Sequence, residues 1–335
     1  MTITDLASWS QRLTCYTAAL GGWLATRRPD WWRPLLANGP FLGIRPAGSL
    51  WQFDHSPAPW VPAFGLSVHG CDDWEVAGAA MAGHRASAPV IVAGDVYRLP
   101  WQQGYRRRHA PHWFVLPSYR APAEIRDPLE LTGPEGVQKP YRAPLEEQAL
   151  AEWTEALPIG DPVHELRERS VIGPAAAQLG RRYRWLAPDD TGAAPAAEEQ
   201  EPYERLEGPD ACHALADRLA EAGTDPAAYL QVDDFWQAAR QRELVVAAAA
   251  ADPGLLSAAG LTHWCAALEV WRQLPALLLR ARMMARDGQP HGARPVIAAL
   301  RRAAVFEGRH LVAAGPSETA TDRPMPHRAE LWEQR

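Results

Sequence analysis

Residues 89–97 read Pro-Val-Ile-Val-Ala-Gly-Asp-Val-Tyr, and residues 112–119 read His-Trp-Phe-Val-Leu-Pro-Ser-Tyr. Short runs of β-branched and aromatic residues between turn-forming residues are typical of β-strands. A third strand is predicted over residues 123–127, which Pro128 ends. These runs decide the fold class, because they place a sheet in the first half of the chain.

Two helices are predicted ahead of these strands. Residues 13–27 carry an apolar face after Thr14, which can cap the helix, and residues 72–84 begin with two aspartates, either of which can act as a cap. Residues 29–62 are broken by proline and glycine and are rich in aromatic side chains, so we expect loops and short turns there. Helices followed by strands predict an α+β fold, with the helices packed on an antiparallel sheet.

The composition changes near residue 145, after which the chain is rich in Ala, Leu and Arg and no strand is predicted. We expect a first domain over residues 1–145 and a mainly α-helical domain over residues 146–314. Residues 187–204 are expected to form a flexible acidic loop, and residues 315–335 a polar tail. The predicted helices of the second half cover residues 145–156, 162–182, 209–222, 226–251, 255–286 and 291–304.

Composition and charge exclude several classes of protein. The chain has 335 residues and a net charge of -6, so it has no overall electrostatic attraction to nucleic acid or to anionic lipid. No signal peptide and no membrane-spanning run are recognisable. We therefore expect a cytoplasmic protein with free thiols, with no nucleic acid and no membrane among its partners.

The common catalytic and cofactor motifs are absent from the sequence. There is no GxxxxGK[ST], GxSxG, HExxH or CxxC pattern, and the histidines are scattered. We predict no metal site and no cofactor. Lys139 is the only lysine, which argues against Schiff-base chemistry.

What remains is a possible thiol site. Cys15 begins a predicted helix, where the helix dipole stabilises a thiolate, while His112 begins a strand and Asp127 ends the next one. These groups can meet as nucleophile, base and orienting carboxylate. The alternative is that Cys15 is a small buried hydrophobe, His112 a core histidine and Asp127 a turn residue. The remaining thiols are interpreted as structural: Cys71, Cys212 and Cys265.

A basic run stands between the first two strands. Arg106, Arg107 and Arg108 precede His109. Such a run is most often a solvated loop, and its functional alternative is a site for a phosphate or an acidic carrier domain.

Residues 88–101 and 112–115, together with Tyr105 and His109, resemble the family named for butirosin biosynthesis protein H. The shared features are a Pro-Val strand, an Asp-x-Tyr-x-Leu-Pro segment and a histidine that opens an apolar strand. Asp127-Pro128 matches the acid that follows in the family, and Cys15 matches its cysteine at a helix start. The resemblance covers roughly residues 10 to 150, and many members also carry a helical C-terminal domain.

The resemblance implies a papain-like cysteine fold for the first domain and acyl transfer as the activity. It implies Cys15 as nucleophile, His112 as base and Asp127 as the orienting group. The acyl group would arrive as a thioester on an acyl or peptidyl carrier protein, whose phosphopantetheine arm belongs to the partner, so the chain needs no cofactor of its own. The setting it implies is natural-product (antibiotic) biosynthesis.

Further residues are candidates for substrate or oxyanion contacts. The papain-like resemblance implies a glutamine before the cysteine that completes the oxyanion hole, and Gln11 is the only one nearby. The backbone N–H of Cys15 is the more secure oxyanion donor. The Asp-x-Tyr segment and the residues after it add the other candidates, which are Asp95, Tyr97, Tyr105 and His109.

We therefore expect an acyl-Cys15 intermediate that passes its acyl group to an amine of a small-molecule acceptor, to an amine of the same chain in a cyclising release, or to water. A cysteine peptidase or amidase with the same triad is an alternative. A non-catalytic binding or scaffold protein of a biosynthetic cluster is another. The acyl donor, the acceptor and the oligomeric state stay open, a dimer included.

Overall fold

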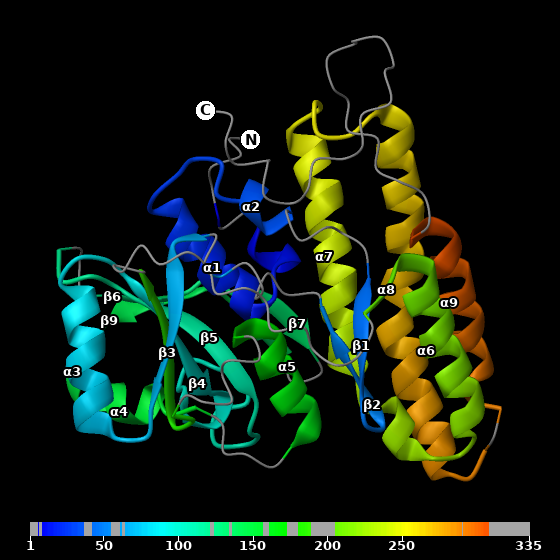
Figure 1. Cartoon of the computed structure of the whole chain (residues 1–335), viewed down its shortest axis with the longest axis horizontal. Helices are drawn as coiled ribbons and strands as arrows, with labels where there is room; N and C mark the ends of the chain where they lie inside the picture. Colours follow the sequence, from blue (N-terminus) through cyan, green and yellow to red (C-terminus); the bar gives the residue numbers. More distant parts are fainter. Residues whose placement is uncertain are drawn as a thin grey trace.

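A six-stranded antiparallel sheet forms the centre of the first half of the protein (Figure 1). The computed structural model describes residues 6, 9–36, 42–54, 61, 64–120, 124–133, 136–156, 161–172, 180–188, 205–289 and 291–307. The strand order is β3-β10-β4-β5-β6-β9, and every neighbouring pair is antiparallel. The bounds are β3 Leu66–Cys71, β4 Val90–Asp95, β5 Pro111–Leu116, β6 Glu124–Asp127, β9 Tyr141–Pro144 and β10 Tyr183–Pro188.

The three strands predicted from the sequence are present and adjacent. β4 and β5 pair along their whole length, with Gly94 opposite His112, and β6 follows β5 in the sheet. Both faces of this hairpin are buried, because β4 and β5 are apolar at almost every position. The α+β prediction with an antiparallel sheet is therefore confirmed.

Helices cover the two faces of the sheet. Helix α1 (Cys15–Ala25) packs on one face, against Trp113 and Val115 of β5. Helices α3 (Trp74–Arg85) and α4 (Leu150–Trp153) lie on the opposite face, over Phe114 and Leu116. Because side chains alternate along a strand, β5 contributes to both apolar layers.

The predicted caps of the first two helices are correct. Thr14 is the N-cap of α1, and it forms a capping box with Thr17. Asp73, rather than its neighbour Asp72, caps α3 by accepting from the N–H of Val76. Asp72 instead accepts from backbone amides of the segment that enters β10.

The C-terminal part is largely helical and has its own apolar core. Figure 1 shows α6, α7, α8 and α9 standing together at one side of the sheet region. Aromatic and aliphatic side chains of β1 and β2 also enter this core. The bounds are α5 Pro162–Ile172, α6 Gly208–Ala222, α7 Val232–Ala251, α8 Ala258–Arg286 and α9 Arg294–Glu307, with 3₁₀ turns at Glu147–Ala149 and Pro226–Tyr229.

The expectation of loops over residues 29–62 is wrong in part. Helix α2 (Arg33–Leu36) and the hairpin of β1 (Gly43–Ala47) and β2 (Leu50–Phe53) lie there, and β11 (Leu206–Glu207) extends that hairpin. Pro46 is the reason that β1 was not predicted, because proline is rare inside strands. It is tolerated here because it stands near the end of β1. The short hairpin β7 (Leu131–Gly133) and β8 (Gly136–Gln138) was also not predicted.

The expectation of a strand-free second half is wrong as well. Strand β10 lies between β3 and β4 in the sheet. The helix predicted over 162–182 is α5, which ends at Ile172, and the segment at 180–182 is not helical. Tyr183, Trp185 and Leu186 are all buried, and a strand buried on both faces shows no alternation that would distinguish it from a helix. Residues 187 and 188 of the predicted acidic loop belong to β10, whereas 189–204 and the tail 315–335 lie outside the described residues.

The packing crosses the domain boundary predicted at residue 145. β10 comes after the boundary in sequence but joins the sheet, while β1 and β2 precede it and pack against the helices. Within the described part of the chain, no helix combines the length and the apolar character needed to cross a membrane.

Candidate active site

Cys15 occupies the first turn of α1 and is half-buried. The side-chain oxygen of Thr14 accepts from the N–H of Thr17, and the carbonyl of Thr14 accepts from Ala18. The backbone N–H groups of Cys15 and Tyr16 have no acceptor among the described residues. Two unpaired amides beside a thiol are suitable donors to an oxyanion.

His112 stands at the start of β5 and is 2% exposed. Its Nε2 lies 2.7 Å from Oδ2 of Asp127, at the end of the neighbouring strand β6. Because Nε2 faces Asp127, Nδ1 is the ring nitrogen left for the sulfur of Cys15. The sheet therefore orients the imidazole through the pairing of two adjacent strands.

Asp127 is fully buried and accepts hydrogen bonds on both oxygens. Besides His112, its Oδ2 accepts from Nε1 of Trp101 at 2.8 Å and from Nε2 of Gln102 at 2.6 Å. Its Oδ1 accepts from the backbone N–H of Leu129 at 3.1 Å. These donors compensate the burial of a charged carboxylate, which is otherwise strongly unfavourable.

The protonated form of His112 is stabilised by its surroundings. Burial alone lowers the pKa of His112, but the charge and the hydrogen bond of Asp127, together with those of Cys15, outweigh burial and raise the pKa to about 10. An imidazolium next to a thiol favours the thiolate, which is the nucleophilic form of cysteine. The structure thus brings together the three residues predicted as nucleophile, base and orienting group.

A cavity of about 330 Å³ opens beside these groups. Its volume is at the small end of ligand-binding pockets. The wall is built by both halves of the protein, because α5, α7 and α8 contribute side chains opposite α1 and β5; Figure 1 shows α5 between the sheet and α7. The lining residues include Cys15, Tyr16, Val96, Gln102, Arg108, His112, Trp113, Leu129, Leu131, Arg167, Glu168, Val171, Asp233, Trp236 and Pro275.

The charged groups on the far wall of the cavity are mostly paired. Arg167 bonds Asp233 at 3.2 Å and Asp234 at 3.1 Å, and these charges outweigh burial and raise the pKa of Arg167. Glu168 pairs with Arg184, but burial raises the pKa of Glu168. The ion pairs therefore lie at one end of the cavity, and apolar side chains such as Trp113 and Val171 form much of the rest of its wall.

Gln102 was not predicted from the sequence, although it lines the cavity and contacts both partners of the His–Asp pair. Its Nε2 lies 3.0 Å from Nε2 of His112 and 2.6 Å from Oδ2 of Asp127. Only the amide nitrogen can face the carboxylate, because an amide oxygen there would repel it. No sequence pattern marks this residue, since it stands in an irregular loop.

Asp95 organises the loop that carries Gln102. The carboxylate is fully buried at the end of β4, and its Oδ1 accepts from the backbone amides of Tyr97 and Ala110, each at 3.1 Å. Both ends of the loop 97–110 are therefore fastened to one side chain. Through this loop Asp95 supports the donors to Asp127, and it does not line the cavity itself.

Three other predicted substrate residues lie outside the cavity wall. His109 Nδ1 is 2.5 Å from Oδ2 of Asp95, and its ring stacks on Tyr97 at 4.5 Å. The guanidinium of Arg106 lies over the ring of Tyr105 at 5.3 Å. None of the three residues lines the cavity.

The structure also does not bring Gln11 into the cavity. Its side chain is exposed, and its amide donates to Oε1 of Glu130 at 2.5 Å. Ser10 donates to the other oxygen of Glu130 at 3.0 Å. Gln11 thus joins the segment before Cys15 to the segment after Asp127.

Arg240 of α7 reinforces the same junction. Its Nη1 donates to the carbonyls of Ser10, Leu13 and Glu130 at 3.4, 3.2 and 3.2 Å, and its guanidinium lies over Trp236 at 4.6 Å. Burial lowers the pKa of Arg240 to about 10. A side chain of the helical region therefore helps to hold the loop that presents the nucleophile.

The other cysteines lie apart from this site, and a structural role for them stays a prediction. Cys212 is buried in the helical core, and burial raises its pKa. Cys71 ends β3 and accepts from the N–H of Asp73 at 3.4 Å, and Cys265 is exposed on α8. None of these thiols lines the cavity.

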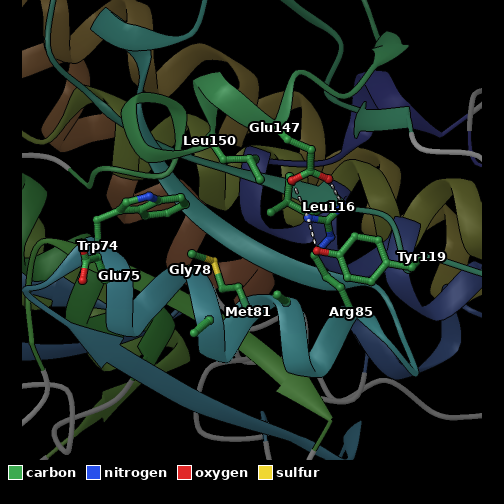
Figure 2. A pocket seen from close by; sticks show the side chains of 11 residues that line it. Trp74, Glu75, Gly78, Met81, Arg85, Leu116, Tyr119, Glu147 and Leu150 are labelled. Atoms are coloured by element: carbon green, nitrogen blue, oxygen red, sulfur yellow. Dashed lines mark hydrogen bonds and ion pairs between the residues drawn. The ribbon is translucent and has the colours of Figure 1, made fainter.

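A second pocket, of about 250 Å³, lies at the surface of α3 (Figure 2). Figure 2 shows the guanidinium of Arg85 between Glu147 and Tyr119. Arg85 is buried and donates to both oxygens of Glu147 and, through Nε, to the carbonyl of Pro117 at 2.9 Å. This polar centre is satisfied within the protein and includes no residue of the triad.

The chain matches no known protein-family model and no curated protein. Assignment of a function therefore depends on the geometry of Cys15, His112 and Asp127.

Proposed function

We propose that the protein is a cysteine-dependent acyl-transfer enzyme that takes an acyl group from a thioester through an acyl-Cys15 intermediate. The observation that carries the proposal is the position of His112, which bonds Asp127 and lines the same cavity as Cys15. A nucleophile, a base and a group that orients the base are the minimum set for covalent acyl transfer.

The proposed fold type of the sheet region is papain-like. A helix that begins at the nucleophilic cysteine packs on an antiparallel sheet, and adjacent strands of that sheet carry the base and the carboxylate. The resemblance to the butirosin biosynthesis protein H family suggested the same arrangement, and this agreement supports the assignment.

In the first step, the thiolate of Cys15 attacks the carbonyl carbon of the thioester. The backbone amides of Cys15 and Tyr16, which have no acceptor among the described residues, are the proposed donors to the resulting oxyanion. As the intermediate collapses, the bond from carbon to the departing sulfur breaks. The imidazolium of His112 gives its proton to the leaving thiolate, and acyl-Cys15 with a neutral His112 remains.

In the second step, an amine attacks acyl-Cys15. His112 accepts the proton that the amine loses, the carbon–nitrogen bond forms, and the bond to the sulfur of Cys15 breaks. The thiolate and the imidazolium are restored, so the cycle is balanced in protons and electrons. Asp127 keeps the ring oriented in both steps, because its contact is on Nε2 and leaves Nδ1 for the proton transfers.

The cavity suits a small apolar acyl group. Tyr16, Trp113, Leu129 and Val171 give it largely apolar walls, and its volume of about 330 Å³ excludes a folded partner. The carrier that delivers the thioester therefore stays outside, and an extended arm brings the acyl group to Cys15. Exchange between thioesters is nearly thermoneutral, so positioning and oxyanion stabilisation are the main contributions of the enzyme.

The test is detection of the acyl-enzyme by intact mass. The protein is incubated with an acyl N-acetylcysteamine thioester, and we expect a mass increase equal to one acyl group. Cys15→Ala should abolish the increase, whereas Cys265→Ala, at an exposed thiol outside the cavity, should retain it.

The alternatives predict different results in the same assay. Cleavage of peptide amides without acylation by thioesters would identify a peptidase or amidase. Absence of both reactions, with partners still bound, would identify a non-catalytic scaffold and would overturn the proposal.

A further inference from the structure

Three consecutive arginines lie beside the cavity, and the third of them lines it. Arg106, Arg107 and Arg108 precede β5 in the chain, and all three are exposed. Arg108 also lines the cavity beside Cys15. The whole chain has a net charge of -6, so this run is a local reversal of charge next to the candidate site.

The backbone of this run is held in an unusual conformation. Arg106 has a φ of 56°, and it is the only non-glycine residue in the described part of the chain with a positive φ. This left-handed conformation is unfavourable for a residue with a Cβ. It is held by hydrogen bonds from Arg106 N to Tyr97 O and from the amides of Arg107 and Arg108 to Gly104 O. The loop presents long cationic side chains to solvent.

The charges of Arg106 and Arg107 are only weakly engaged. Arg106 lies 3.3 Å from Glu152, and the two side chains are 57% and 46% exposed. Exposed ion pairs of this kind contribute little to the stability of the fold, so Arg106 can exchange Glu152 for another anion at little cost. Arg107 forms no ion pair with a described residue.

The position of the run next to the cavity suggests which partner these arginines bind. Whatever brings a thioester to Cys15 must stay outside a cavity of about 330 Å³, and Arg106 and Arg107 lie beyond its wall. We infer that Arg106 and Arg107 dock an acidic surface of the protein that delivers the acyl thioester. This inference rests on the proposed acyl-transfer function. Complementary charge of this kind accelerates association and orients the partner.

The anionic group could come from the partner's surface or from the phosphate of its arm. Arg106 and Arg107 do not line the cavity, so their place fits the protein surface, whereas Arg108 lines the path of the arm. The experiment therefore compares thioesters on three supports: an acidic phosphopantetheine-loaded carrier protein, free phosphopantetheine, and N-acetylcysteamine, which has neither protein nor phosphate.

The variant is Arg106→Glu combined with Arg107→Glu. We expect acylation of Cys15 by the carrier-bound thioester to slow at least ~10-fold at low carrier concentration. The rates with the phosphopantetheine and N-acetylcysteamine thioesters should be unchanged. A matched control reverses Arg280 and Arg286, which are exposed on α8 and do not line the cavity, and it should behave as the wild type. Added salt should slow the wild type with the carrier substrate only.

Equal rates of variant and wild type with the carrier would overturn the docking inference. An equal loss with free phosphopantetheine would also overturn it, because the arginines would then bind the phosphate of the arm. Failure of N-acetylcysteamine thioesters to acylate wild-type Cys15 would instead refute the proposed function. Docking stays testable in that case, because binding of the carrier to Cys15→Ala can be compared with and without the charge reversals by fluorescence anisotropy.

Discussion

Replacing Asp127 by Asn removes one negative charge at 2.7 Å from His112 and keeps the size of the side chain. The pKa of His112 is raised from 6.5 to about 10. This difference corresponds to roughly 5 kcal/mol in favour of the imidazolium. In the variant, burial still disfavours the charged ring and only Cys15 still favours it, so we expect the pKa of His112 to fall toward its ordinary value.

The consequence is measurable as reactivity of Cys15. The rate of modification by iodoacetamide is followed by peptide mass analysis between about pH 5 and 9. Cys265, which is exposed in the same chain, provides an internal reference. At about pH 6 we expect the ratio of Cys15 to Cys265 reactivity to drop at least ~10-fold in Asp127→Asn, because a neutral imidazole no longer stabilises the thiolate.

A second His–carboxylate pair provides a matched control. His109 bonds the buried Asp95 outside the cavity, so His109→Gln should leave the reactivity ratio of Cys15 unchanged. If the ratio at about pH 6 were the same in Asp127→Asn and wild type, the carboxylate would not hold the imidazolium, and the proposed role of the triad would be wrong.

The same pKa shift affects stability. Folding raises the pKa of His112 from 6.5 to about 10, so its contribution to the free energy of unfolding is complete below the lower value and is lost as the pH rises through the higher one. We expect the urea midpoint of the wild type to decrease between about pH 7 and 10. The decrease should be smaller in Asp127→Asn.

Other substitutions test the scaffold by urea unfolding. Glu307→Gln removes the charge that compensates Arg242 in a pair with both side chains 1% exposed, and it should cost roughly 3–5 kcal/mol. Gly94→Ala places a Cβ 2.4 Å from the carbonyl oxygen of Trp153, and it should cost roughly 1–3 kcal/mol. Arg240→Ala leaves three carbonyls without their donor, and it should lower the free energy of unfolding by roughly 1–3 kcal/mol. It should also slow alkylation of Cys15. Unchanged alkylation would show that Arg240 does not position the nucleophile.

Local sequence determined the elements whose signals are short-range. The strands β4 and β5 have continuous β-branched and aromatic runs, and Thr14 marks the start of α1 because a hydroxyl at the cap satisfies a free amide. The candidate residues Cys15, His112 and Asp127 were also named from the sequence, with the help of a family resemblance. Their positions at element ends follow from patterns that span only a few residues.

Only the tertiary structure decided which distant segments meet. Strand β10 enters the sheet between β3 and β4, and no local pattern separates such a fully buried strand from a helix. Gln102 reaches Asp127 of β6 because Asp95, at the end of β4, holds the loop that carries Gln102. The cavity likewise needs α5, α7 and α8 opposite Cys15, and contacts between elements so far apart in sequence depend on packing of the whole chain.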